Sequence, residues 1–246
     1  MGFFTGWSIK HATIVTPVHK SLQLTPYTYA DAGAPAQGYQ VFVPDAAVEC
    51  REICNGYDSR DFYITGAPRR KNSFLTVAIN MEKPFFYRKG VDLLLEAAKE
   101  LPHCLFTIIG KSPSVERLEL PENVTLMPPV PYQELVHHYN AHEFYLQLSM
   151  AEGFPNALCE AMLCGCVPIG SNVFGIPDII GETGYILMKK DKQQLVELIQ
   201  SAVRNGAEAY ASKASDRIRT EFPIEKREKE FVDVIDYLLA KKKVRT

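Results

Sequence analysis

The sequence contains no run of about 18 apolar residues, so no segment has the composition of a membrane-spanning helix. The N-terminal residues also lack the order of charged, apolar and small residues that marks a secretory signal. The formal net charge of −2, from 27 basic and 29 acidic side chains, creates no strong field toward nucleic acid or an anionic membrane. We therefore expect a soluble cytoplasmic protein that binds no nucleic acid and catches any anionic ligand locally.

Cysteine is present but forms neither a disulfide framework nor a metal-binding pattern. The chain has 246 residues, of which 46% are hydrophobic, so it can bury an ordinary core without disulfides. No two cysteine pairs have zinc-finger spacing, and no acidic cluster has the spacing of metal ligands. We therefore favour reduced, buried thiols and no metal over a zinc site. The cysteines are Cys50, Cys54, Cys104, Cys159, Cys164 and Cys166.

From residue 70 onward, short β-branched runs alternate with longer amphipathic patterns of helical period. The runs predict six strands at 73–80, 104–110, 123–130, 143–149, 166–172 and 184–190. The amphipathic patterns predict helices at 89–101, 132–142, 156–165, 191–205 and 225–243. This alternation is typical of βα units on a parallel sheet, so we predict an α/β fold.

The N-terminal part of the chain fits this scheme poorly. Residues 11–22 have the pattern of one strand and a helix start, whereas residues 25–40 are rich in turn residues and have no sustained period. The charged stretch at 69–73 has the composition of a linker. We therefore divide the chain into residues 1–70 and 71–246.

The stretch "SMAEGFPNALCEAMLCG" places two carboxylates, Glu152 and Glu160, around the start of a predicted helix. Ligands of an open parallel sheet bind where strands end and helix N-termini converge. Gly153 leaves room for a ligand, Asn156 is a favoured N-cap residue, and the amides of the first helical turn can hold a phosphate. The pattern fits an anion seat flanked by two acceptors of hydroxyl hydrogen bonds, as a sugar on each side of a diphosphate would need.

Acids near a helix start also have an explanation that needs no ligand. They offset the helix dipole, which is worth about 0.3 to 1 kcal/mol, and spacing alone does not separate the two explanations. With Asn156 as the cap, however, a capping box would place its acid at Cys159 rather than at Glu160. Capping therefore explains Glu160 less well than a ligand role does.

A longer stretch, "EGFPNALCEAMLCGCVPIGSNVFGIPDIIGETGYIL", follows "ICNGYDSRDF", "YRKGVDLLLEAAKEL" and "LFTIIGK" in the chain. Together they resemble the C-terminal, donor-binding half of the retaining GT-B glycosyltransferases of family 4. The resemblance implies a Rossmann-like parallel sheet flanked by helices, preceded by a remnant of the first domain. It also implies a UDP-sugar or GDP-sugar as donor substrate, no further cofactor, and retaining transfer without a metal.

The resemblance assigns roles to the acidic stretch by motif position. Glu160 would accept the ribose hydroxyls, and Glu152 would hold the donor sugar with the amides around Gly153 and Phe154. The turn at Asn156 and Ala157 would meet the diphosphate.

Two basic residues are assigned to the diphosphate through the same resemblance. Lys89 in "YRKG" matches the family's Lys-Gly pair, but the Arg that the family places soon after the preceding strand has no counterpart here. Arg88 is the substitute, because a guanidinium can grip two phosphate oxygens; an exposed basic residue before a helix is an equal alternative. We name Glu152, Lys89 and Arg88 as the candidate catalytic residues.

The loop "SNVFGIPDII" follows another predicted strand. Gly175 permits a tight turn, and Pro177 suits the first turn of a helix. The resemblance places this loop near the donor sugar or the interdomain cleft, whereas a plain connection is the alternative.

Full-length members of the resembled family have two Rossmann-like domains, of which the first supplies the acceptor side. This chain has room for one, and its His11 and His19 lie in the wrong context to match the acceptor-side His of that first domain. Three interpretations follow: a glycosyltransferase, complete or completed by a partner chain or second copy; a nucleotide-sugar-binding module without activity alone; and a structural remnant or interaction protein. The combination of Glu152, Glu160 and Lys89 argues against the third.

The acceptor is not specified, so a glycan, a lipid and a protein all stay open. The basic tail "AKKKVRT" follows the amphipathic "FVDVIDYLL", which leaves peripheral membrane contact as an alternative to a frayed end.

Overall fold

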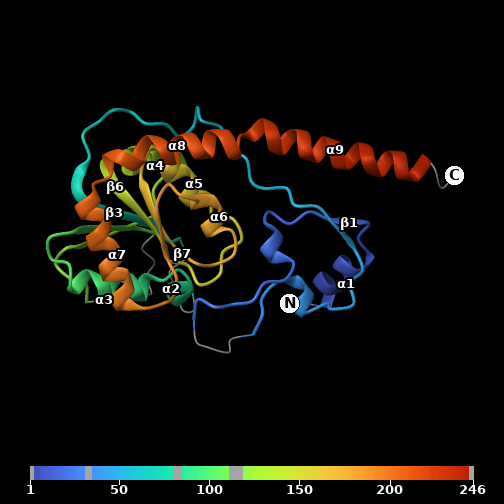
Figure 1. The fold of residues 1–246 in the computed structure, drawn as a ribbon, viewed down its shortest axis with the longest axis horizontal. Helices are drawn as coiled ribbons and strands as arrows, with labels where there is room; N and C mark the ends of the chain where they lie inside the picture. Colours follow the sequence, from blue (N-terminus) through green and yellow to red (C-terminus); the bar gives the residue numbers. More distant parts are fainter. Residues whose placement is uncertain (1–2, 31–34, 80–81, 83–84, 111–118, 244–246) are drawn as a thin grey trace.

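The computed structural model describes residues 3–30, 35–79, 82, 85–110 and 119–243 (Figure 1). Its main body is a six-stranded, all-parallel sheet with strand order β5-β4-β3-β6-β7-β8. The strands are β3 (Arg70–Val77), β4 (Leu105–Ile109), β5 (Val124–Met127), β6 (His142–Gln147), β7 (Val167–Ser171) and β8 (Tyr185–Leu187). The predicted α/β fold and its six strands are confirmed.

The chain builds this sheet outward in two directions from its middle. It runs from β3 through β4 to β5 at one edge, returns to β6 beside β3, and then runs through β7 to β8 at the other edge. The loops that follow β3 and β6 therefore leave the sheet side by side in opposite directions. Such a switch point is where open α/β sheets bind ligands.

Stacked aromatic side chains hold the three central strands in register. Phe74 of β3 pairs with Phe106 of β4 and Phe144 of β6, with ring centroids 5.2 Å and 4.7 Å apart. All three rings are buried. Cross-strand aromatic pairs stabilise a sheet beyond their area burial, so this ladder fixes where the carboxyl ends of β3 and β6 lie.

Helices cover both faces of the sheet (Figure 1). They are α2 (Phe85–Arg88), α3 (Val91–Lys99), α4 (Leu135–Ala141), α5 (Asn156–Leu163), α6 (Ile176–Ile180), α7 (Lys192–Asn205) and α8 (Glu208–Glu221). Helix α3 packs against α7, whereas α5 packs against α4 and α8. Right-handed crossovers that lead in opposite directions place α3 and α5 on opposite faces. We call residues 70–221 the sheet domain.

The charged stretch at 69–73 is not a linker, and that prediction is wrong. Arg70 begins β3, and the guanidinium of Arg69 donates to the carbonyl oxygens of His142, at 2.6 Å, and Cys164. These carbonyls follow the ends of α4 and α5, where a positive charge is favourable. Arg69 therefore joins two helix ends to the start of the sheet.

The N-terminal lobe, residues 3–50, contains α1 (Phe3–His11) and a short parallel pair of β1 (Ile14–Val15) and β2 (Glu49–Cys50). Figure 1 shows it beside the sheet domain, with the long helix α9 (Ile224–Lys243) running across to it. Its own core consists of the buried Tyr39, Val43 and Ala46, against which Ile9, Val15 and Val48 pack. Neither α1 nor α8 was predicted from the sequence.

Helix α9 ties the N-terminal lobe to the sheet domain. The hydroxyl of Tyr237 donates to Glu49 Oε2 at 2.8 Å, and the guanidinium of Arg51 lies 3.8 Å from the centroid of the Tyr237 ring. Among the described helices, none is long and apolar enough to cross a membrane. Residues 244–246, the end of the basic tail, lie outside the described part of the chain, and the membrane contact stays a prediction.

Candidate active site

Lys89 and Glu152 meet at the switch point, although they follow different strands. Lys89 comes after α2, on the connection from β3, and Glu152 lies on the connection from β6 to α5. Lys89 Nζ donates to Glu152 Oε2 at 2.6 Å, with 20% and 23% of the two side chains exposed. Because the pair is mostly shielded from water, salt screens it less than it would a surface pair.

The backbone around Lys89 explains why a glycine follows it. Gly90 has φ 71°, and a Cβ there would lie 2.2 Å from the carbonyl oxygen of Leu148. The amide of Met150 also donates to the carbonyl of Arg88 at 2.7 Å. A residue with a side chain at position 90 would push the two connections apart, so the Lys-Gly pair sets where the Lys89 ammonium lies.

Arg88 lies differently from its neighbour. Its side chain is exposed, and its guanidinium lies 4.8 Å from the centroid of the Phe85 ring. The structure thus brings Lys89 to Glu152 and directs Arg88 to an aromatic ring. The phosphate-binding role of Arg88 stays a prediction.

Glu160 lies in the second turn of α5 and is buried. The hydroxyl of the buried Tyr139 donates to Glu160 Oε2 at 2.9 Å. Burial raises the pKa of the Glu160 carboxyl, and the hydrogen bond from Tyr139 offsets part of that effect. A buried carboxylate with a tyrosine partner does not serve as a surface helix cap, so the dipole explanation does not fit Glu160.

Both carboxylates act on one buried side chain, Tyr145 of β6. Its hydroxyl accepts a hydrogen bond from the amide of Val77 at 3.3 Å. Burial raises the pKa of Tyr145 most, and the negative charges of Glu160 and Glu152 raise it further. The two acids therefore approach the centre of the sheet from the loop and from the helix, close to the same tyrosine.

Asn156 is not the N-cap of α5, and that prediction is wrong. The cap position is Pro155, which makes no side-chain cap bond, and Asn156 is the first helical residue. The Asn156 Oδ1 atom instead accepts hydrogen bonds from Asn55 Nδ2 and the Tyr57 hydroxyl, both at 2.9 Å. These long-range partners override the local capping preference, and the first-turn amides of α5 receive no side-chain acceptor from the cap.

The remaining predicted residues present backbone rather than side chains. The Phe154 ring is buried and lies 6.4 Å from the Tyr57 ring and 5.2 Å from the Phe222 ring, between centroids. Ala157 is half-buried in the first turn of α5. At Gly153, the place of a side chain is taken by Leu22, whose Cδ1 atom would lie 2.8 Å from a Cβ. The missing side chain at Gly153 thus makes room for the N-terminal lobe.

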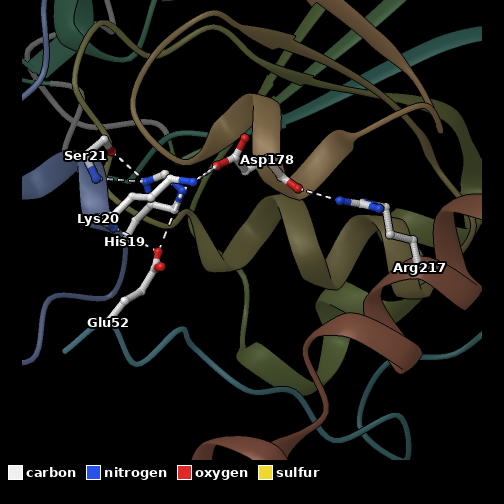
Figure 2. A network of polar contacts seen from close by, with 6 residues as sticks. All are labelled: His19, Lys20, Ser21, Glu52, Asp178 and Arg217. Atoms are coloured by element: carbon white, nitrogen blue, oxygen red, sulfur yellow. Dashed lines mark hydrogen bonds and ion pairs between the residues drawn. The ribbon is translucent and has the colours of Figure 1, made fainter.

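His19 is a residue that sequence reasoning placed in the wrong context. It is buried, and its Nε2 atom lies 2.9 Å from Asp178 Oδ2 of α6, in the loop region after β7 (Figure 2). The two residues are 159 positions apart, so no spacing pattern could have indicated the contact. His11, in contrast, stacks on Trp7 of α1 at 4.4 Å between ring centroids.

The thiols of the chain are free and gather at no metal centre. All six cysteines are unpaired with one another, and burial raises the pKa of the Cys104 thiol to about 11. Within the described ranges, no three His, Cys, Asp or Glu side chains gather in a way that could hold a metal ion.

The geometry of a strand-switch site with two carboxylates and a lysine is matched by a sequence family. The family model of glycosyl transferases group 1 matches residues 74–220, from β3 to α8. The chain belongs to this family. This group 1 glycosyltransferase sequence is 28% identical over 162 residues to one component of human phosphatidylinositol N-acetylglucosaminyltransferase, and the match covers 61% of this chain and 33% of that protein.

Solved glycosyltransferases share the fold. Sucrose-phosphate synthase from Thermosynechococcus elongatus matches with a TM-score of 0.71 and 21% identity over 82% of this chain and 56% of its own. The Anabaena protein HepE, solved with UDP and glucose, matches with a TM-score of 0.71 and 15% identity over 93% and 64%. The architecture is that of GT-B enzymes, and this group 1 chain spans about a third of the human relative's length.

Proposed function

We propose that this chain forms the donor-binding half of a retaining, metal-independent family 4 glycosyltransferase that uses a UDP-sugar or GDP-sugar. The Lys89–Glu152 pair at the switch point, beside the buried Glu160, carries the proposal. It offers one cation for a diphosphate and one carboxylate for a sugar hydroxyl at a place where α/β sheets bind ligands.

Each group has a role in the proposed transfer. The bond between the sugar C1 atom and the diphosphate oxygen breaks, the bond between C1 and an acceptor oxygen forms on the same face, and the acceptor proton leaves with the diphosphate. Lys89 and the first-turn amides of α5 stabilise the charge that develops on the leaving diphosphate. Glu152 orients the donor sugar, and Glu160 accepts from the ribose.

The relatives suggest where to begin with substrates. The human relative is named as part of an N-acetylglucosaminyltransferase, and HepE was solved with UDP. We therefore propose UDP-N-acetylglucosamine as the first donor to test. We also propose that a partner chain or a second copy completes the acceptor side, in keeping with the relative's name as one component of a larger enzyme. The second candidate is a binding module without transferase activity.

Calorimetric titration of the full chain with UDP, GDP and UDP-N-acetylglucosamine tests the donor site. We expect Lys89→Met to weaken binding of both nucleotides about tenfold or more, because a charge-assisted hydrogen bond contributes about 1.5–3 kcal/mol. Lys99→Met, which removes a charge at the far end of α3, is the matched control and should bind as the wild type does.

The result that refutes the proposal is a folded wild-type chain with no affinity for any of the three compounds. If nucleotides bind, a donor hydrolysis and transfer assay on the chain alone separates the two candidates. Turnover without a partner excludes the binding module.

A further inference from the structure

The ring of His19 has partners on both nitrogens. Nδ1 lies 2.6 Å from Ser21 Oγ and accepts from the Ser21 amide at 3.3 Å (Figure 2). A ring nitrogen that accepts from a backbone N–H carries no proton, so in the neutral ring the proton sits on Nε2. Nε2 then donates to Asp178 Oδ2 at 2.9 Å. The turn at His19–Ser21 thus aims one N–H at α6.

The same ring also contacts the candidate site. A Cβ at Gly175 would lie 3.0 Å from His19 Cγ on one side and 2.5 Å from the Gly153 carbonyl oxygen on the other. Gly175 is therefore held between the His19 ring and the loop that carries Glu152. This is a place where only a glycine fits, because a side chain would have to displace either the ring or the site backbone.

Helix α6 is short, and side chains from other elements hold it from two sides. Arg217 of α8 donates from its guanidinium to the carbonyl oxygens of Asp178 and Ile179, at 2.6 Å and 2.7 Å (Figure 2). Just before α6, Phe174 has φ 46°, a left-handed conformation that costs a bulky residue about 1–3 kcal/mol. A strained turn persists only where its surroundings fix it, and His19 and Arg217 do so from opposite sides.

The other charges around His19 are at the surface. Glu52 Oε1 lies 3.9 Å from Nε2, and Lys20 Nζ lies 3.7 Å from Asp178 Oδ2. The Asp178 side chain is 56% exposed. Loss of its histidine partner therefore leaves a carboxylate that water can solvate, so the consequence falls on the position of the loop and not on global stability.

We propose that His19 is a positioning residue, which through Asp178 holds residues 173–178 against Gly153 and so shapes the sugar side of the donor site. The inference rests on the proposed donor site. It assigns to the N-terminal lobe a part in donor-sugar recognition, in addition to its structural contacts with α9.

Two variants of similar size separate the hydrogen bond from packing. The amide nitrogen of Gln lies where Nε2 lies in His, whereas that of Asn lies where Nδ1 lies. His19→Gln is therefore expected to keep the bond to Asp178, and His19→Asn to lose it. Asp178→Ala removes the acceptor, and Lys20→Ala removes an exposed charge beside Asp178 as the matched control.

The first measurement is hydrogen exchange of the ligand-free chain, followed by mass spectrometry. We expect faster exchange in peptides that cover residues 173–181 for His19→Asn and Asp178→Ala, and wild-type exchange for His19→Gln and Lys20→Ala. Unchanged exchange in His19→Asn, or an equal increase in His19→Gln, overturns the proposal.

The second measurement compares the affinities of the variants for UDP and UDP-N-acetylglucosamine. We expect His19→Asn to bind UDP as the wild type does and UDP-N-acetylglucosamine about tenfold more weakly, with recovery in His19→Gln. Equal weakening of both compounds indicates a merely structural role and overturns the inference, as does no weakening of either. A wild-type chain that binds neither compound refutes the proposed function itself, and this outcome is distinct because it precedes any variant.

Discussion

The N-terminal lobe buries Tyr39, Val43 and Ala46 in a core of its own, whereas the sheet domain buries whole strands and the helices that cover them. Small cores exclude too little apolar surface from water to be stable alone. The lobe is accordingly held from outside, by α9 at Glu49 and by α6 at His19. The comparison shows that one part of the chain folds through its own core, and that the other depends on contacts with the first.

Removing the central aromatic ring of the sheet should give the largest effect on stability. Phe74 stacks on Phe106 and Phe144, and its truncation leaves a cavity in a fully packed layer. We expect Phe74→Ala to lower the free energy of unfolding by about 3–5 kcal/mol, as measured by urea denaturation followed by circular dichroism.

The control for this loss is Leu105→Ala on β4, because Leu105 is 47% exposed and its removal creates no cavity. We expect a change within about 0.5 kcal/mol. A similar loss in both variants would show that the sheet domain does not owe its stability to the central ladder, and the comparison would fail.

A buried titrating group gives the sheet domain a pH dependence of intermediate size. Burial raises the pKa of Glu160 above its ordinary 4.5, so the folded chain holds this proton more tightly than the unfolded chain. The free energy of unfolding should therefore fall as pH rises from 4.5 through the raised pKa, and stay lowered above it. Glu160→Gln should lose this dependence, as measured by urea unfolding at a series of pH values.

The exposed Glu122 supplies the matched change. Glu122→Gln should keep the wild-type profile, because its carboxyl lies at the surface. An identical pH profile in wild type and Glu160→Gln would contradict the buried environment of Glu160.

The smallest effect is expected where α9 meets the N-terminal lobe. The hydrogen bond from Tyr237 is the main cause of the lowered pKa of Glu49. We expect Tyr237→Phe, which keeps the ring beneath Arg51, to increase hydrogen exchange within residues 9–50 and to leave the global unfolding midpoint unchanged. A shift of that midpoint would mean that the lobe and the sheet domain unfold as one unit.

Local sequence patterns predicted the sheet domain because its strands are buried on both faces and read as continuous apolar runs. Helix α8 escaped prediction because it buries small or polar residues, Ala214 and Ser215, together with Ile218. Its apolar stripe is too sparse to give a helical period. The pattern is visible only once the partner helix α5 is known.

The candidate site was predictable where its residues follow a strand and a glycine turn, as Glu152 and Lys89 do. It was not predictable where partners come from distant segments. Asn156 has the chemistry of a helix cap, yet Asn55 and Tyr57 take its side chain. The contact between His19 and Asp178 likewise exists only through the arrangement of the lobe on the sheet domain.

The ion pair between Lys89 and Glu152 gives each of the two side chains a counter-ion from within the protein. A free phosphate that takes Lys89 leaves Glu152 without its cation and adds a second negative charge beside it. A neutral sugar offers nothing to compensate Lys89. Only a ligand that brings an anion and a hydroxyl together satisfies both partners at once, so the pair would discriminate against each half of a nucleotide-sugar presented alone.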